Sequence, residues 1–154
     1  MVARARFAAS LAVALALAAA TARAQSEPPM AGADKPFAEH HLVLQLSDRD
    51  PAKESLVISV AYNLLKAYGP DKIAIEVVAF GPGIDLLRAG NANRARVDSL
   101  ISQGVQFDVC MNTIDTIERE TGKKVELNPK AVPVQVGVGR ILTLTEKGYT
   151  LVRP

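Results

Sequence analysis

Short apolar runs alternate with helix-spaced apolar positions from residue 40 onward. Residues 40–46 (HHLVLQL) and 72–80 (KIAIEVVAF) are runs of strand length, and the second is apolar almost throughout. Between them, apolar residues recur at helical spacing from Pro51 until Gly69-Pro70. A nearly continuous apolar run is typical of a strand that is covered on both faces, so this pattern predicts a parallel sheet with helices packed on it.

The same alternation continues through the second half of the chain. The spacing predicts a helix over 91–103, a strand over 105–109, a helix over 112–122 and a strand over 131–136. Residues 137–148 (GVGRILTLTEKG) fit a helix or a strand; the helix is favoured because Lys147-Gly148 is a good helix end, and a short strand then follows in 149–154. The sequence therefore predicts a three-layer α/β/α fold with a mainly parallel sheet of about five strands.

The N-terminus has the pattern of a secretory signal peptide. Arg4 and Arg6 precede an apolar run over 7–20, and Ala22-Arg23-Ala24 is an A-x-A cleavage pattern. A membrane anchor is the alternative, but the run is shorter than the roughly 20 residues that a bilayer span needs. We expect a periplasmic or secreted protein after cleavage near Ala24. The expected division of the chain is a signal peptide over 1–24, a flexible leader over 25–39 and one α/β domain over 40–154.

Charge and residue types exclude several classes of partner. The full chain carries a formal charge of +2, but without the three arginines of the signal peptide 15 basic residues face 16 acidic ones. With no basic cluster, we expect neither nucleic acid nor an anionic membrane as a partner. We also expect no metal, because His40 and His41 are adjacent and would point to opposite faces of a strand. We expect no cofactor either, because the chain has neither a phosphate-loop motif nor the G-x-G-x-x-G of a dinucleotide site.

Cys110 is the single cysteine of the chain and lies within GVQFDVCMNTID, residues 104–115. It cannot close an internal disulfide, so it is either a reactive thiol or a small buried apolar side chain. The pattern places it between a strand and a helix that Asn112 can cap, where exposed N–H groups and the helix dipole favour a thiolate. Both interpretations stay open on this pattern alone.

Two pairs of glycines fall at predicted strand ends. Gly81 and Gly83 lie in GPG, and Gly137 and Gly139 lie in GVGR ahead of Arg140. Backbone amides in such loops can face an anion, and Arg140 would add positive charge beside an anionic ligand or a thiolate. A tight turn and a solvated arginine at a helix start are the simpler explanations, since GPG lacks the lysine of a phosphate loop.

The domain resembles the DsrE/DsrF-like family of sulfur-handling proteins. The C-x-N-T segment at the cysteine and the terminal G-Y-x-L-V-x-P are the most telling parts of the resemblance. The matching segments are YNLLKAYG (62–69), EVVAFGPGIDLL (76–87), GVQFDVCMNT (104–113) and VPVQVGVGRILTLTEKGYTLVRP (132–154). The resemblance implies a three-layer α/β/α fold, homo-oligomers such as trimers or hexamers, and a persulfide-carrying cysteine. That cysteine would be Cys110, with Asn112 and Thr113 in its supporting motif.

Two function hypotheses follow from these observations. In the first, Cys110 accepts sulfur as a persulfide and hands it to an acceptor thiol. In the second, the protein is a non-catalytic module that binds a small ligand or assembles into oligomers, and Cys110 is packed and inert. The known relays of the DsrE family work in the cytoplasm, so the export pattern leaves the sulfur donor and acceptor open.

The cleavage pattern generates the first prediction. Mature protein recovered from the exported fraction should begin at Gln25, because Ala22-Arg23-Ala24 precedes it. N-terminal sequencing measures this directly. Recovery of intact Met1, or retention of the protein in the membrane fraction, would contradict it.

Overall fold

The computed structural model describes residues 27–154, so the predicted signal peptide and its cleavage point lie outside the described residues. Within this range, five strands alternate with four α-helices and one 3-10 helix, η1. Their bounds are β1 (His40–Leu46), α1 (Pro51–Tyr68), β2 (Ile73–Ala79), η1 (Gly81–Leu87), α2 (Arg94–Ser102), β3 (Gln106–Cys110), α3 (Met111–Thr121), β4 (Val132–Val134), α4 (Gly137–Glu146) and β5 (Thr150–Val152).

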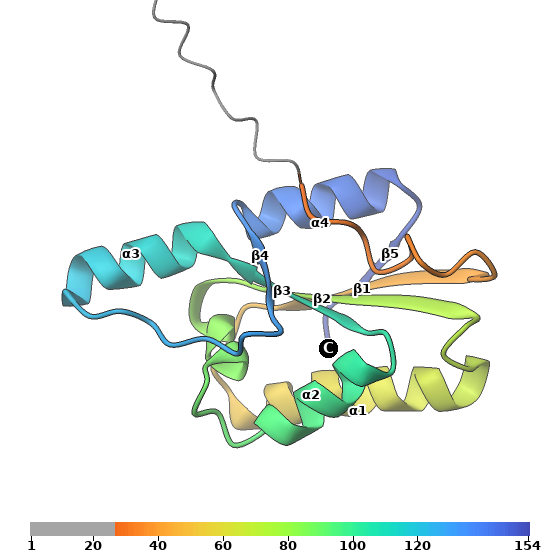
Figure 1. Ribbon diagram of the computed structural model, residues 1–154, viewed down its shortest axis with the longest axis horizontal. Coiled ribbons are helices and arrows are strands. Elements are labelled where there is room, and N and C mark those ends of the chain that lie inside the picture. The colour runs from red at the N-terminus through yellow and green to blue at the C-terminus, as the bar shows by residue number, and fades with distance from the viewer. Residues whose placement is uncertain (1–26) are drawn as a thin grey trace, which may run out of the picture.

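All five strands pair in parallel, in the order β4-β3-β2-β1-β5. The chain steps one strand at a time from β1 to β4, and α4 then carries it back across the sheet to β5. Because crossovers between parallel strands are right-handed, this reversal places α4 on the face opposite α1 and α2 (Figure 1). The predicted α/β/α layers and parallel sheet are confirmed.

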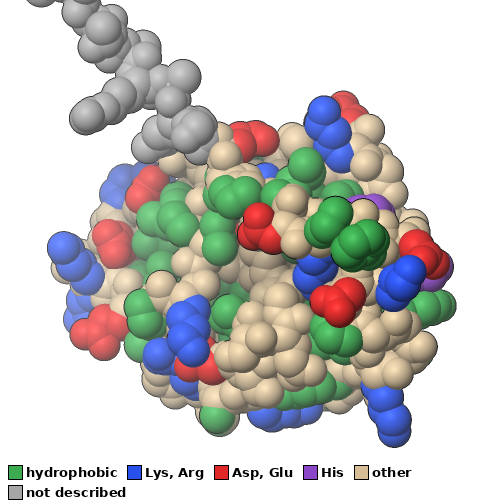
Figure 2. Space-filling model, turned by 45° about the vertical axis from the view of Figure 1, so that its right-hand side comes forward, with side chains coloured by type: hydrophobic (Ala, Val, Ile, Leu, Met, Phe, Trp, Pro, Cys, Tyr) green, Lys and Arg blue, Asp and Glu red, His purple; other side chains and the backbone are tan. Residues whose placement is uncertain are grey.

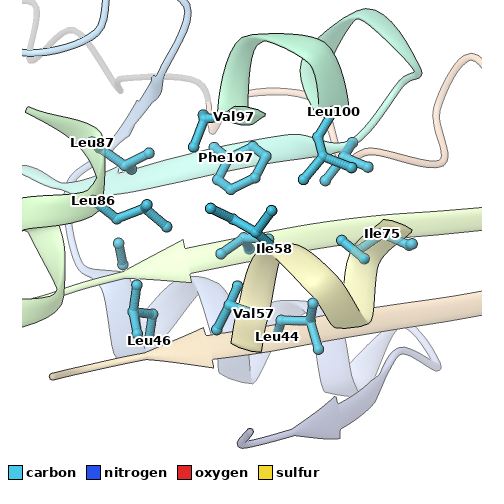
Figure 3. Close-up of a cluster of buried hydrophobic side chains, with 14 of the residues drawn as sticks. Leu44, Leu46, Val57, Ile58, Ile75, Leu86, Leu87, Val97, Leu100 and Phe107 are labelled. Carbon is cyan, nitrogen blue, oxygen red and sulfur yellow. The ribbon is translucent and has the colours of Figure 1, made fainter. Parts of the chain in front are cut away.

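The larger part of the core lies between the sheet and helices α1 and α2. Helix α1 begins where predicted: Pro51 takes the first turn, the Asp50 carboxylate accepts a hydrogen bond from the Ala52 amide at 2.8 Å, and Gly69 ends the helix with φ of 85°. The apolar side chains that meet in this layer include Leu44, Leu46, Val57, Ile58, Ile75, Val97, Leu100 and Phe107 (Figure 3).

The opposite face of the sheet has a smaller apolar core. Ile141 and Leu144 of α4 pack there, and the other buried members of this cluster are Val43, Ala74, Val78 and Tyr149. The first turn of α4 adds little to it, because Gly137 and Gly139 have no side chain and Val138 is 58% exposed. The attachment of this turn to the sheet must therefore come from polar contacts.

Several element boundaries differ from the sequence-based expectations. The GPG segment opens η1, which is held by the buried side chains of Ile84, Leu86 and Leu87, and α2 begins only at Arg94. Helix α3 begins at Met111, so Cys110 and not Asn112 occupies the N-cap position. None of the helices in residues 27–154 has the length and hydrophobicity of a membrane span.

The segment before β1 lies against the α4 face of the sheet. Its Ala31 amide donates to the Glu76 carboxylate at 3.0 Å, its Gly32 amide donates to the Tyr149 hydroxyl at 3.1 Å, and Lys35 Nζ donates to the Ile73 carbonyl at 3.0 Å. The lack of apolar periodicity over 25–39 predicts a flexible leader. Ala31, Gly32 and Lys35 of this segment make polar contacts with the domain, which periodicity does not report.

Candidate functional site

Cys110 is the last residue of β3 and the N-cap of α3. This is the carboxyl edge of the parallel sheet, as expected from the sequence, and it is where ligands of open α/β sheets gather. The residue is 6% exposed. The positive end of the α3 dipole lies at this point, although the Cys110 side chain makes no capping hydrogen bond to the amides of the helix.

The thiol contacts the connection between β4 and α4. The Gly137 amide donates a hydrogen bond to Cys110 Sγ at 3.2 Å, and Sγ lies 3.9 Å from the Gln135 carbonyl oxygen. A Cβ atom on Gly137 would lie 3.1 Å from the Cβ atoms of Cys110 and Phe80. Glycine at 137 therefore allows the helix start to approach the sulfur closely.

Asn112 and Thr113 follow Cys110 in the first turn of α3 and bond to neighbouring loops. The Asn112 amide donates to the Gln135 carbonyl at 3.1 Å, and Gln135 Nε2 returns a bond to Asn112 Oδ1 at 2.7 Å. Thr113 Oγ1 accepts from the Gly81 amide at 3.0 Å. Both residues thus tie the start of α3 to the loops on either side of Cys110, which suits the supporting role expected of them.

The glycine amides expected to face an anion are used inside the protein. The Gly81 amide bonds to Thr113, the Gly83 amide to the Phe80 carbonyl, and the Gly137 amide to Cys110. A Cβ atom on Gly83 would lie 2.3 Å from the Leu46 carbonyl oxygen, so close backbone packing explains that glycine. These bonds correct the expectation of an anion site at Gly81 and Gly83. For Gly139, a Cβ would only meet the side chain of Val136.

Arg140 is buried and paired, which corrects its expected role beside an anionic ligand. Its Nε lies 2.5 Å from Glu76 Oε1 and 3.2 Å from Asp108 Oδ2, and both carboxyl side chains are 0% exposed. Its Nη1 and Nη2 donate to the carbonyl oxygens of Pro28 and Pro29 at 2.9 and 3.0 Å. The guanidinium charge is therefore compensated within the protein. We call Glu76, Asp108 and Arg140 the charge cluster.

The pKa of Asp108 is raised to about 9, chiefly by burial. The hydrogen bond with Glu76 and the negative charge of Glu76 also raise this pKa, and they outweigh the lowering effects of Gln106 and Arg140. Asp108 therefore holds a proton at neutral pH. One arginine cation then faces one carboxylate, so the charge cluster has no net charge. This neutrality explains how three ionisable groups can be buried in a layer that is otherwise apolar.

Sequence reasoning missed Glu76 and Asp108. Each stands inside a run that was assigned correctly as a strand, KIAIEVVAF and VQFDV, and the first was also predicted to be covered on both faces. A charge within such a run needs a buried partner, because an isolated ion in a protein interior is strongly unfavourable. The signal that could have revealed the cluster was an acidic residue in each of two strands, together with an arginine in the predicted helix over 137–148.

The histidines lie apart, as predicted from their adjacency. The His40 ring is 4.3 Å from that of Tyr68, on the α1 face, and the His41 ring is 5.1 Å from that of Tyr149, on the α4 face. Over residues 27–154, the structure groups no three His, Cys, Asp or Glu side chains in a way that could hold a metal ion.

An apolar surface surrounds the start of α4 and the edge strand β4. Val136, Val138 and Leu142 are 48%, 58% and 58% exposed. Between β4 and α4 lies a cavity of about 610 Å³, lined in part by Pro133, Val134, Val136 and Leu142. Elsewhere, on the face that Figure 2 presents, acidic and basic side chains are interspersed. We call Val136, Val138 and Leu142 the β4–α4 surface.

Neither the protein-family models nor the curated proteins contain a match to the chain. Among solved structures, the chain is similar to MTH1491 from Methanobacterium thermoautotrophicum, with a TM-score of 0.67 and 30% sequence identity over 75% of this chain and 100% of that one. The two proteins belong to one family. MTH1491 is described as a protein of unknown function, so this relationship carries the fold and not an activity.

The raised pKa of Asp108 generates a prediction about stability and pH. Its native pKa of about 9 lies above the roughly 3.9 of an unfolded chain, so the folded state binds this proton more tightly. The associated stability is present below about pH 4 and is lost as pH rises toward about 9. Asp108→Asn carries no proton to lose. The free energy of unfolding of Asp108→Asn, minus that of the wild type, should therefore increase by about 1.4 kcal/mol per pH unit between about pH 5 and about pH 8.

Urea unfolding at several pH values measures this difference. Asp98→Asn is the matched control, because the hydrogen bond from Asn128 and nearby charges lower the pKa of Asp98. The difference in free energy of unfolding between Asp98→Asn and the wild type should therefore not change with pH over the same range. A flat difference for Asp108→Asn as well would show that Asp108 is ionised in the folded protein.

Proposed function

We propose that the protein is an exported, thiol-based sulfur carrier or transferase in which Cys110 holds sulfur as a persulfide. The observation that carries the proposal is the Gly137 amide 3.2 Å from Cys110 Sγ, at the N-terminus of α3. An amide donor and a helix N-terminus both favour thiolate and persulfide anions. The DsrE-like segments around Cys110, Asn112 and Thr113 support the same chemistry, with the protein acting in the periplasm or outside the cell.

The transfer needs no external oxidant or metal. The Cys110 thiolate attacks the outer, sulfane sulfur of a donor persulfide, R–S–SH, and forms a new S–S bond. The donor S–S bond breaks, its electron pair leaves with R–S⁻, and Cys110 becomes Cys110–S–SH. Attack by an acceptor thiolate on the outer sulfur reverses these roles and returns the Cys110 thiolate.

The small exposed fraction of Cys110 bears on the donor. At 6% exposure, the residue offers little surface for contact with a folded protein thiol. A small donor such as inorganic polysulfide or a low-molecular-weight persulfide fits this site better. We therefore expect sulfur uptake from small donors in solution, without a protein partner.

Sulfur uptake is tested by intact-protein mass spectrometry. After incubation with polysulfide, the folded mature protein should gain the mass of one sulfur atom, and a thiol reductant should remove it, because a persulfide contains a reducible S–S bond. Cys110→Ser should keep the fold by circular dichroism and show no gain. Absence of added sulfur on the wild type, with a thiol that alkylates only after unfolding, would contradict the proposal.

The burial of Cys110 also favours a second candidate, a non-catalytic binding or assembly module with an inert thiol. A buried free cysteine commonly serves as a small apolar side chain. The β4–α4 surface and its cavity would then be the functional part of the molecule. Alkylation of Cys110 in the folded protein separates the two candidates, because only a carrier needs a reachable sulfur.

We also propose a homo-oligomer, such as a trimer or hexamer, that buries the β4–α4 surface. Among the large aliphatic side chains of residues 27–154, Val138 and Leu142 are the most exposed. They lie one helical turn apart on α4. Residues at this spacing share a helix face. Contiguous apolar surface of this kind marks interaction sites.

Light scattering measures the assembly. The mature protein should have a mass of several chains at micromolar concentration, and Leu142→Glu should lower it, because a charge at the interface would be buried without a partner. Leu56→Glu on α1, at a leucine that is 46% exposed, is the matched control and should leave the mass unchanged. A monomeric wild type, or equal masses for both variants and the wild type, would contradict this interface.

A further inference from the structure

Two polar contacts join α4 to β3. The Gly137 amide bonds to Cys110 Sγ at 3.2 Å, and Arg140 Nε bonds to Asp108 Oδ2 at 3.2 Å. Cys110 and Asp108 are two residues apart on β3 and so point to the same face of the sheet. Gly137 and Arg140 are one turn apart on α4. The charge cluster and the thiol are therefore neighbouring attachments between the same helix and the same strand.

The first turn of α4 depends on these two contacts. Gly137 and Gly139 contribute no side chain, and the exposed Val138 does not pack on the sheet. Glycine also gives a helix start the largest backbone freedom of any residue. Arg140 is the buried side chain nearest to this turn, and it bonds to the sheet through Glu76 and Asp108.

We propose that Arg140 is a positioning residue for Cys110: anchored in the charge cluster, it holds the first turn of α4 so that the Gly137 amide stays directed at Cys110 Sγ. This inference rests on the proposed use of Cys110 as the nucleophile. Arg140 acts through Gly137 and does not touch the sulfur. Its guanidinium is held from two sides, by the carboxyl groups of the sheet and by the carbonyl oxygens of Pro28 and Pro29.

The effect of the charge cluster on Cys110 is geometric rather than Coulombic. Besides Cys110, the buried ionisable groups on this face of the sheet are Glu76 on β2, Asp108 on β3, Arg140 on α4, and Tyr149, which follows α4. His41, at the start of β1, is only half-buried and lies against Tyr149. Burial raises the pKa of Tyr149, so its hydroxyl is neutral near pH 7. With Asp108 protonated, the remaining two charges cancel. Replacing both charged groups by neutral side chains would thus leave the net charge near Cys110 unchanged and remove the anchor, together with its bonds to Pro28, Pro29 and Ala31 of the leader.

The variant Glu76→Gln/Arg140→Met makes this replacement. It avoids an unpaired buried charge, and such neutral replacements of buried ion pairs are often tolerated. Two quantities are measured on the folded protein: hydrogen exchange at the Gly137 amide, and the alkylation rate of Cys110 by iodoacetamide as a function of pH. Lys35→Met is the control, because it removes a leader contact to the Ile73 carbonyl and leaves the charge cluster intact.

The double variant should exchange the Gly137 amide faster than the wild type. Its alkylation profile should move to higher pH, with a rate about tenfold lower at neutral pH, because one hydrogen bond to the thiolate is lost. Lys35→Met should match the wild type in both measurements. If the double variant does not fold, Arg140→Lys, whose shorter side chain reaches Glu76 without the forked contacts, should change both quantities in the same direction by less.

A folded variant with the wild-type exchange rate and pH profile would overturn the inference. This outcome is distinct from a failure of the carrier proposal. No sulfur uptake by the wild type, together with a shifted alkylation profile in the variant, would reject the carrier function and retain the positioning role. Sulfur uptake by the wild type, together with an unchanged alkylation profile in the variant, would retain the carrier function and reject the positioning role. A wild-type thiol that alkylates only after unfolding would reject both.

Discussion

A single arginine on α4 makes it possible for two carboxyl groups to lie inside the sheet. Glu76 stands in the middle of β2, where every residue is buried, and Asp108 lies beside it on β3. An unpaired ion at such a position costs several kcal/mol. Arg140 balances one carboxylate and Asp108 keeps its proton, so the group is uncharged as a whole. The packing of α4 and of the leader segment on this face depends on that arrangement.

The charge cluster also connects the fold to its candidate chemistry. Strand β3 carries Asp108 and Cys110 on one face, and α4 carries Arg140 and Gly137 one turn apart. A contact made for stability therefore lies next to a contact with the sulfur. The solved relative MTH1491 has the same type of fold, and the chemistry proposed for this chain rests on its own residues around Cys110.

The sequence predicted those parts of the structure that hydrophobic periodicity reports. It located the strands, most of the helices and the position of Cys110 at a strand end. It did not predict the contacts of Arg140, because a helix-start arginine has the same pattern whether it faces solvent or a buried carboxylate. The contacts of the leader were not predicted for a related reason: its bonds to Glu76 and Tyr149 join residues far apart in the sequence. Pairings of this kind are set by the tertiary structure.

The protonation state of Asp108 decides whether the charge cluster is neutral. Infrared spectroscopy of the folded protein detects the C=O stretch of a protonated carboxyl group, and the difference between wild type and Asp108→Asn isolates this residue. A protonated-carboxyl band from Asp108 should be present at neutral pH and disappear as pH rises through about 9. Absence at neutral pH of any protonated-carboxyl band that Asp108→Asn or Glu76→Gln removes would show two ionised carboxylates beside one arginine and contradict a neutral cluster.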